Sequence, residues 1–224
     1  MARVLSIFFW CLSGLAPAAS AAGPFATLPG METESGYLAR LLINEVPFPG
    51  EGGYVSVANT EAAMAQILWV LEGRLNRIPQ GYRQAHVAAV TTSQVTDLIT
   101  AGGVHGQCEG FYRDPNGRLA TVPRVEERVQ YLLRIANSGG RPGKFAGLIN
   151  YARGLAESYL RGGIAEADRF AAIRRIGSVP VTGGGYSWMT DRDYYHPGGN
   201  FVKIPNSMEG SLGNNRFFTL RSLQ

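Results

Sequence analysis

A single glutamate lines up with three leucines in the segment 37–51. Leu38, Leu41 and Leu42 fall at positions i, i+3 and i+4, and Glu45 falls at i+7, so all four share one face of a helix. A carboxyl group on that face points toward the core or toward the floor of a cleft. Burial there disfavours the charged form and raises the pKa, as a general acid working near neutral pH requires. A glutamate that caps the helix or pairs with an arginine is the alternative interpretation.

The residues around Glu45 place it in the last turn of its helix. We expect this helix to begin at about Glu34, with Ser35 as its N-cap, and the proline- and glycine-containing turn at 47–50 ends it. Glu51 lies in the loop just beyond. It is the second candidate carboxylate and a candidate contact for substrate.

Aromatic side chains gather in the glycine-rich segment from 177 to 200. Tyr186, Trp188 and Tyr195 offer flat apolar faces on which sugar rings can lie, and amide side chains such as Gln107 can bind sugar hydroxyl groups. We therefore take these four residues as candidate substrate contacts. Packing of the loop is the alternative explanation for the aromatic residues.

This combination of side chains is suited to cleavage of glycosidic bonds. Such enzymes need a protonated carboxyl group that gives its proton to the leaving oxygen, and most need a second carboxylate. A lytic transglycosylase works with one carboxyl group, because a hydroxyl of the substrate attacks within the same molecule. Glu45 is the candidate for that single group.

A different chemistry would use Cys108 and His196. Papain-like and CHAP-like amidases carry their cysteine before their histidine in the chain, and Gln107-Cys108 resembles the Gln-Cys start of CHAP domains. An enzyme of that class would cut the stem peptides of peptidoglycan. A buried, unreactive Cys108 is the other interpretation.

The sequence indicates neither a metal site nor a cofactor. Its three histidines, His86, His105 and His196, form no HExxH motif and no close ligand pair, and no phosphate-binding loop is present. The net charge of +4 comes without a basic helix or a basic-aromatic strand, so we do not expect a nucleic-acid partner. A mild positive charge also suits a polyanionic surface such as a bacterial envelope.

The first 22 residues have the pattern of a secretory signal. Arg3 precedes an apolar stretch from Val4 to Leu15 that is too short to span a membrane comfortably, and Ala19-Ser20-Ala21 is a cleavage motif. We expect a protein that is secreted, periplasmic or held at the cell envelope, without a membrane segment after cleavage. Residues 23–33 form a short leader, and residues 34–224 form one domain.

Most of that domain has the periodicity of amphipathic helices. The expected architecture is mostly α-helical, with an irregular C-terminal part rich in glycine and aromatic residues. Short strands are expected in the segments FVKIP and RFFTLR, and residues 101–117 are expected to form a loop broken by glycines. After the Glu45 helix, we expect helices capped by Thr60 with an apolar face through Leu75, from Ser93 to Ile99, from Pro123 to about Ile135, from Phe145 to Arg161 and from Ala165 to Ile176.

Three short motifs resemble the SleB-like cell-wall hydrolases of the spore-cortex-lytic type. In order they are LARLLINEVPFPGE, an alanine-rich helix ending in ILWVLEGRL, and GQCEGF, and Phe217-Phe218 matches the family's terminal aromatic pair. The resemblance implies a lysozyme-like helical fold that cleaves the sugar backbone of peptidoglycan, with glycan strands as the partner. By its place in the motif, Glu45 is similar to the family's catalytic acid. A glycan-binding envelope protein without catalysis is the remaining alternative.

Overall fold

The computed structural model describes residues 25–139, 143–164, 166–190 and 197–223. The expected signal segment therefore lies outside the described residues. The described part contains six α-helices and several short strands, so the fold is mixed, with modest strand content, rather than mostly helical as expected.

The first helix, α1 (Glu34–Asn44), begins at the expected residue, and its N-cap lies two residues earlier than expected. Thr33, not Ser35, is the N-cap, and its hydroxyl oxygen accepts a hydrogen bond from the Gly36 amide at 3.1 Å. Leu38, Leu41 and Leu42 are completely buried, as their spacing predicts. The helix ends at Glu45, whose amide still donates to the Leu41 carbonyl.

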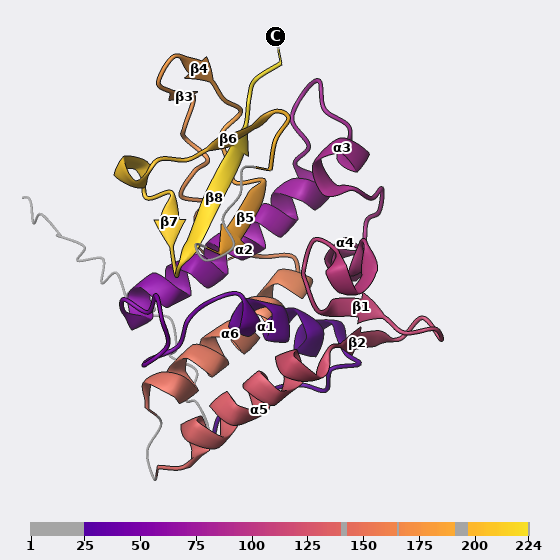
Figure 1. Cartoon of the computed structure of the whole chain (residues 1–224), viewed down its shortest axis with the longest axis vertical. Coiled ribbons are helices and arrows are strands. Elements are labelled where there is room, and N and C mark those ends of the chain that lie inside the picture. The colour runs from indigo at the N-terminus through magenta and orange to yellow at the C-terminus, as the bar shows by residue number, and fades with distance from the viewer. Residues whose placement is uncertain (1–24, 140–142, 165, 191–196, 224) are drawn as a thin grey trace, which may run out of the picture.

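Three helices form one layer of the molecule. α5 (Pro123–Asn137) and α6 (Lys144–Leu160) both pack against α1, in the lower half of Figure 1. Pro123 occupies the first turn of α5, as expected, because a proline there loses no intrahelical hydrogen bond. An ion pair of 2.8 Å between Arg40 and Glu126 joins α1 to α5.

The second helix, α2 (Val57–Asn76), connects the helical layer to the strands. It packs against α6 and also against β5 (Ser187–Thr190) and β7 (Ser211–Leu212). Figure 1 shows it running diagonally behind these strands. Its N-cap is Ser56 rather than the expected Thr60, which is buried and donates its hydroxyl proton to the Pro47 carbonyl.

The C-terminal strands form one antiparallel sheet around β8 (Asn215–Leu220). β5 and β6 (Phe201–Lys203) flank β8, and β7 also pairs with it. The register puts Trp188 of β5 opposite Phe217 of β8. The strands expected in FVKIP and RFFTLR are confirmed as β6 and β8.

Two short hairpins differ from the expectation. β1 (Phe111–Arg113) lies in the segment 101–117 that was expected to be a loop, and it pairs across a turn with β2 (Leu119–Thr121), just beyond that segment. β3 (Arg175–Ile176) and β4 (Val179–Pro180) pair where the helix from Ala165 was expected to end, and that helix is wrong over the described residues 166–176. A carboxylate oxygen of Asp168 accepts the Phe170 amide at 2.9 Å, a local bond that competes with helix formation.

The remaining elements are short. α3 (Gln84–Ala88) was not expected. The short helix expected from Ser93 to Ile99 is present as α4 (Val95–Thr100), and its N-cap is Gln94, which makes no side-chain capping bond. Two 3₁₀ turns cover Gly103–His105 and Asn206–Met208.

Candidate active site

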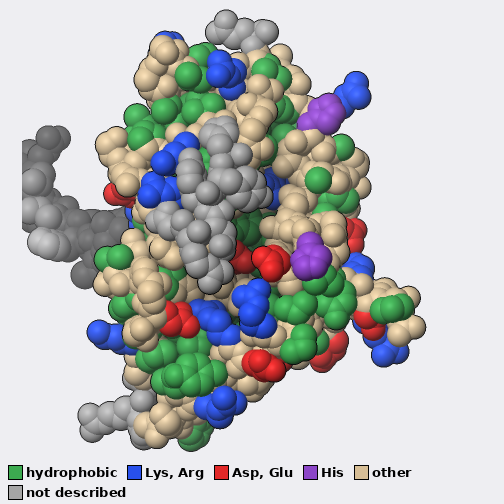
Figure 2. All heavy atoms as spheres, in the orientation of Figure 1, with side chains coloured by type: hydrophobic (Ala, Val, Ile, Leu, Met, Phe, Trp, Pro, Cys, Tyr) green, Lys and Arg blue, Asp and Glu red, His purple; other side chains and the backbone are tan. Residues whose placement is uncertain are grey.

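An open cleft of about 1080 Å³ lies where the helical layer meets the sheet. It is formed by the end of α1, the end of α2, the start of α5, the loop at 106–109 and strand β5. Figure 2 shows acidic and basic side chains next to one another near the middle of this face. The cleft brings together four of the six residues that the sequence singled out: Glu45, Glu51, Gln107 and Trp188.

Hydrogen bonds hold both the side chain and the backbone of Glu45 at the cleft. Its side chain is half-buried, and its carboxylate oxygen Oε2 accepts a hydrogen bond of 2.8 Å from the indole Nε1 of Trp188. Its backbone carbonyl accepts one of 2.7 Å from the amide of the completely buried Asn215. Trp188 of β5 thus holds the carboxyl group, and Asn215 of the central strand β8 holds the backbone of the turn that carries it.

The surroundings of Glu45 favour its protonated form. Desolvation raises the pKa of this carboxyl group above its ordinary value, and the charge of Glu109 adds to the rise. The Trp188 hydrogen bond and the charges of Arg128 and Arg124 oppose the rise without reversing it. The geometry and the electrostatics both suit a group that donates a proton near neutral pH.

Glu51 also lines the cleft, but its carboxylate is already occupied. Arg128 donates to it through Nε at 3.1 Å and through Nη2 at 2.6 Å, and the Phe48 amide donates to it at 2.7 Å. Arg128 also donates to the carbonyls of Ile43 and Val46 on either side of Glu45. Glu51 and Arg128 therefore form a clamp on the turn that carries Glu45, and Glu51 is poorly placed as an independent second acid.

On the other side of the cleft, the buried Arg74 links α2 to strand β5 and to the loop at 106–109. The Arg74 guanidinium lies 5.7 Å from the centroid of the Trp188 ring, donates to the Tyr186 carbonyl at 2.6 Å, and donates to Gln107 Oε1 at 2.5 Å. The amide nitrogen of Gln107 donates to the Ala88 carbonyl. Both ends of the Gln107 side chain are thus engaged within the protein, where it holds Arg74. Gln107 still lines the cleft, and its contact with a sugar stays a prediction.

Tyr186 does not join the cleft as expected. Tyr186 is buried behind it, at 6% exposure, and its hydroxyl donates to the Arg77 carbonyl at 2.8 Å. The carbonyl of the preceding Gly185 approaches to 3.0 Å of the position that a Cβ would take at Gly73, so the absent side chain allows this segment close to α2. Tyr186 therefore packs the sheet onto α2, and Tyr195 lies outside the described residues.

The cysteine of the alternative chemistry is buried. Cys108 is 2% exposed, and desolvation, followed by the charge of Glu45, raises the pKa of its thiol, although Arg74 opposes the rise. A thiol must ionise to act as a nucleophile, so this environment disfavours amidase chemistry at Cys108. Its expected partner, His196, lies outside the described residues.

Neither a metal cluster nor a membrane span appears in the described part of the chain. No three His, Cys, Asp or Glu side chains gather there closely enough to hold a metal ion. No helix there combines the length and the apolar character needed to cross a bilayer.

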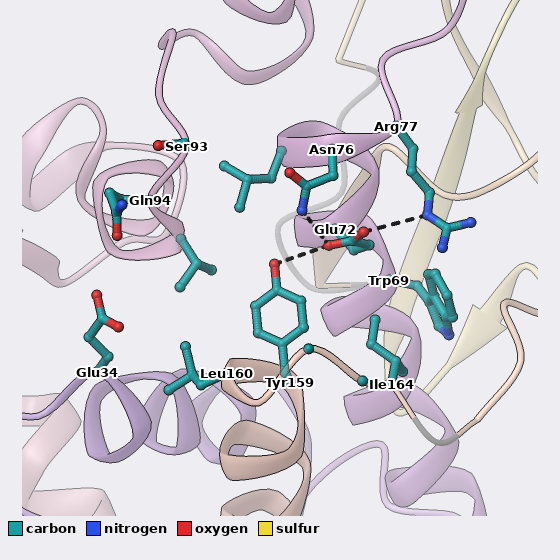
Figure 3. A pocket seen from close by; sticks show the side chains of 14 residues that line it. Glu34, Trp69, Glu72, Asn76, Arg77, Ser93, Gln94, Tyr159, Leu160 and Ile164 are labelled. Carbon is teal, nitrogen blue, oxygen red and sulfur yellow. Dashed lines mark hydrogen bonds and ion pairs between the residues drawn. The ribbon is translucent and has the colours of Figure 1, made fainter.

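A second, smaller pocket of about 430 Å³ lies at the opposite face of α2, near the end of α6. It also contains a glutamate, Glu72, and Figure 3 shows Asn76, Arg77 and Tyr159 converging on its carboxylate. Asn76 donates to it at 2.8 Å and the Tyr159 hydroxyl at 3.3 Å, while Arg77 forms an ion pair of 3.5 Å. Every side of this carboxylate is thus engaged within the protein.

Several cleft residues were missed from the sequence, although one carried a usable signal. Arg74 falls at i+7 from Ile67 on the apolar face of α2, which is the spacing that singled out Glu45 behind Leu38. Arg124 and Arg128 are four residues apart and share a face of α5. Asn215 carried no local signal, because its contact with Glu45 joins residues 170 positions apart.

Comparison with protein-family models, with curated proteins and with solved structures finds no match for this chain.

Proposed function

We propose that this protein cleaves the glycan backbone of peptidoglycan, with Glu45 as the general acid and then the general base. The observation that carries the proposal is the state of Glu45: a half-buried carboxyl group at a large open cleft, held by Trp188, with a pKa raised by desolvation. Glycosidic bonds break when a carboxyl group in this state gives its proton to the leaving oxygen.

The proton transfers close into a cycle that needs one carboxyl group. Protonated Glu45 gives its proton to the glycosidic oxygen as the bond from that oxygen to the sugar carbon breaks, leaving an oxocarbenium-like sugar. The carboxylate of Glu45 then takes the proton of the 6-hydroxyl of the same sugar, whose oxygen bonds to that carbon and forms an anhydro ring. Lytic transglycosylase chemistry needs no second carboxyl group, and Glu51, the nearest carboxylate along the sequence, is held by Arg128 and by the Phe48 amide.

The placement of Glu45 supports a lysozyme-like arrangement as part of the same proposal. The acid lies at the end of a buried helix, at the junction between a helical layer and short antiparallel strands. The short motifs similar to SleB-like hydrolases put a glutamate at this point of the chain. With the signal pattern in residues 1–22, they support export to the cell envelope, where peptidoglycan is the substrate.

Mass spectrometry of the products from purified peptidoglycan, incubated with the protein from residue 22 onward, tests the proposal. We expect anhydro-muropeptides, and their loss in the Glu45→Gln variant. Muropeptides with a free reducing end would keep Glu45 as the acid and replace the transglycosylase by a muramidase. Free stem peptides would move the assignment to Cys108 and His196. Intact glycan with bound protein would leave a binding protein without catalysis.

A further inference from the structure

Arg74 is a buried cation without an anionic partner among the described residues. Only 7% of it is exposed, yet no carboxylate of the described chain lies within ion-pair distance of its guanidinium. Its Nε and Nη1 donate to the Tyr186 carbonyl and to Gln107. Its Nη2 donates to nothing that the structure describes, and the side chain lines the cleft.

The other arginines of the cleft differ from Arg74 in this respect. Arg128 is paired with Glu51 at 2.6 Å, and Arg124 lies 3.8 Å from Glu109. Of the three arginines that line the described cleft, two thus have a carboxylate beside them. The third is the most deeply buried of them, where an uncompensated charge costs most.

Burial of Arg74 without a counter-ion is unfavourable, and a ligand can relieve it. Desolvation lowers the pKa of this guanidinium to about 10, so it remains charged at neutral pH. Its contacts with Tyr186, Gln107 and the Trp188 ring hold it in one orientation before any ligand arrives. A pre-oriented guanidinium with a free nitrogen on a cleft is well suited to accept a carboxylate.

We propose that Arg74 binds a carboxylate of the substrate, so that the cleft selects an acidic glycan over a neutral one. The inference rests on the proposed function and names its substrate class. Trp188 contacts both Arg74 and Glu45, so a carboxylate bound to Arg74 would lie near the sugar whose glycosidic oxygen Glu45 protonates. In peptidoglycan this group is either the free lactyl carboxyl of a sugar or a carboxyl of the attached stem peptide.

A comparison of ligands tests the inference without altering Arg74. Binding to the Glu45→Gln protein would be measured by calorimetry for glycan strands with and without stem peptides, each before and after chemical reduction of the carboxyl groups to alcohols. We expect reduction to weaken binding about tenfold, as loss of a charge-assisted hydrogen bond does. An effect in peptide-free strands assigns the lactyl carboxyl, and an effect confined to peptide-bearing strands assigns the stem peptide. Equal binding before and after reduction in both kinds of strand overturns the inference.

A comparison of variants tests the role of Arg74 itself. In the Glu45→Gln background, Arg74→Gln should abolish the preference for unreduced glycan, whereas Arg77→Gln, on the same helix but outside the cleft, should keep it. Circular dichroism would show whether each variant is folded. If Arg74→Gln does not fold, the comparison of reduced and unreduced ligands still tests the inference, because it leaves Arg74 unaltered. A preference that persists in folded Arg74→Gln protein overturns the assignment.

The two proposals fail in distinguishable ways. If the wild-type protein cleaves reduced and unreduced glycan at equal rates and binds them equally, the proposal of glycan cleavage is supported and the proposal of carboxylate binding by Arg74 is overturned. If it cleaves neither glycan but binds the acidic form through Arg74, the proposal of carboxylate binding is supported and the proposal of glycan cleavage is overturned.

Discussion

Glu45 and Glu72 have similar neighbouring residues but differ in the hydrogen bonds and ion pairs that their carboxyl groups receive. Glu45 and Glu72 each occur at the end of a helix beside a pocket, and each pocket has a tryptophan with an arginine over its ring, Trp188 with Arg74 and Trp69 with Arg77. The Glu45 carboxyl receives one hydrogen bond, from a neutral indole. The Glu72 carboxylate receives an amide, a hydroxyl and an ion pair (Figure 3).

The two carboxyl groups thus differ in the donors that surround them, although their pockets contain similar residues. Three donors compensate Glu72 for its burial, and its charge instead helps to raise the pKa of the Tyr159 hydroxyl, after desolvation. The Glu45 carboxyl accepts one hydrogen bond from the described residues, and desolvation raises its pKa. Glu72 is therefore the matched control for Glu45, as are Arg77 and Trp69 for their counterparts.

The largest difference should appear in the rate of glycan cleavage. We expect Glu45→Gln to lower the release of soluble muropeptides by roughly 10²–10⁴-fold, because the amide has no proton to give. Glu72→Gln should leave the rate within about twofold of wild type at permissive temperature, since Glu72 has no part in the cleft. Equal losses in the two variants would mean that both glutamates act through stability.

Arg128 and Arg77 should contribute differently to the stability of the protein. Arg128→Met removes donors from Glu51 and from the carbonyls of Ile43 and Val46, so we expect a loss of about 2–3 kcal/mol in the free energy of unfolding. Arg77→Met, at a side chain that is 62% exposed, should cost less than about 1 kcal/mol. Urea denaturation measures both, and a loss at Arg128 no larger than that at Arg77 would refute the clamp.

The two tryptophans should differ in their effect on the pH dependence. If Glu45 is the general acid, as we propose, activity should fall as the pH rises through the pKa of that group. The Trp188 hydrogen bond favours the charged form, so Trp188→Phe should move the high-pH limb of kcat/KM to higher pH and lower the maximum about tenfold. Trp69→Phe should leave the limb in place. A limb that moves to lower pH in Trp188→Phe would contradict the role of this bond.

The smallest expected effect is a change in the stability of Glu45→Gln. A folded-state pKa above the unfolded value means that Glu45 contributes fully to stability below the unfolded pKa, and that this contribution is lost as the pH rises through the folded pKa. We therefore expect Glu45→Gln to be more stable than wild type at pH 7, by about 1 kcal/mol or roughly 2–4 °C in Tm, with the gain shrinking toward pH 4. Glu72→Gln should be less stable than wild type, because it loses the charge that three donors compensate. Thermal scans at the two pH values measure this, and a Glu45→Gln protein less stable than wild type at pH 7 would contradict it.

Local periodicity was enough to predict Glu45 and the helix that carries it, but not the three arginines that the helices bring to the cleft. The spacing of Leu38, Leu41 and Leu42 placed Glu45 at the end of a buried helix, and Pro123 marked the start of α5. The same spacing rule applied to α2 would have found Arg74.

Long-range pairing could not be predicted in the same way. The hydrogen bond from Trp188 to Glu45 depends on the register between β5 and β8, which no local pattern fixes. Two predicted sugar contacts, Gln107 and Tyr186, were residues of suitable type whose polar groups are used inside the protein. Residue type alone does not show whether a polar group faces substrate or a backbone carbonyl.

The protonation of Glu45 is tested most directly by an NMR titration of the glutamate side-chain carboxyl carbons, with Glu45 assigned by the signal that Glu45→Gln removes. We expect that signal to titrate above the ordinary glutamate value of about 4.3, because desolvation outweighs the Trp188 hydrogen bond. A signal that titrates at or below the ordinary value would show an ionised carboxylate in the cleft and would contradict Glu45 as the general acid.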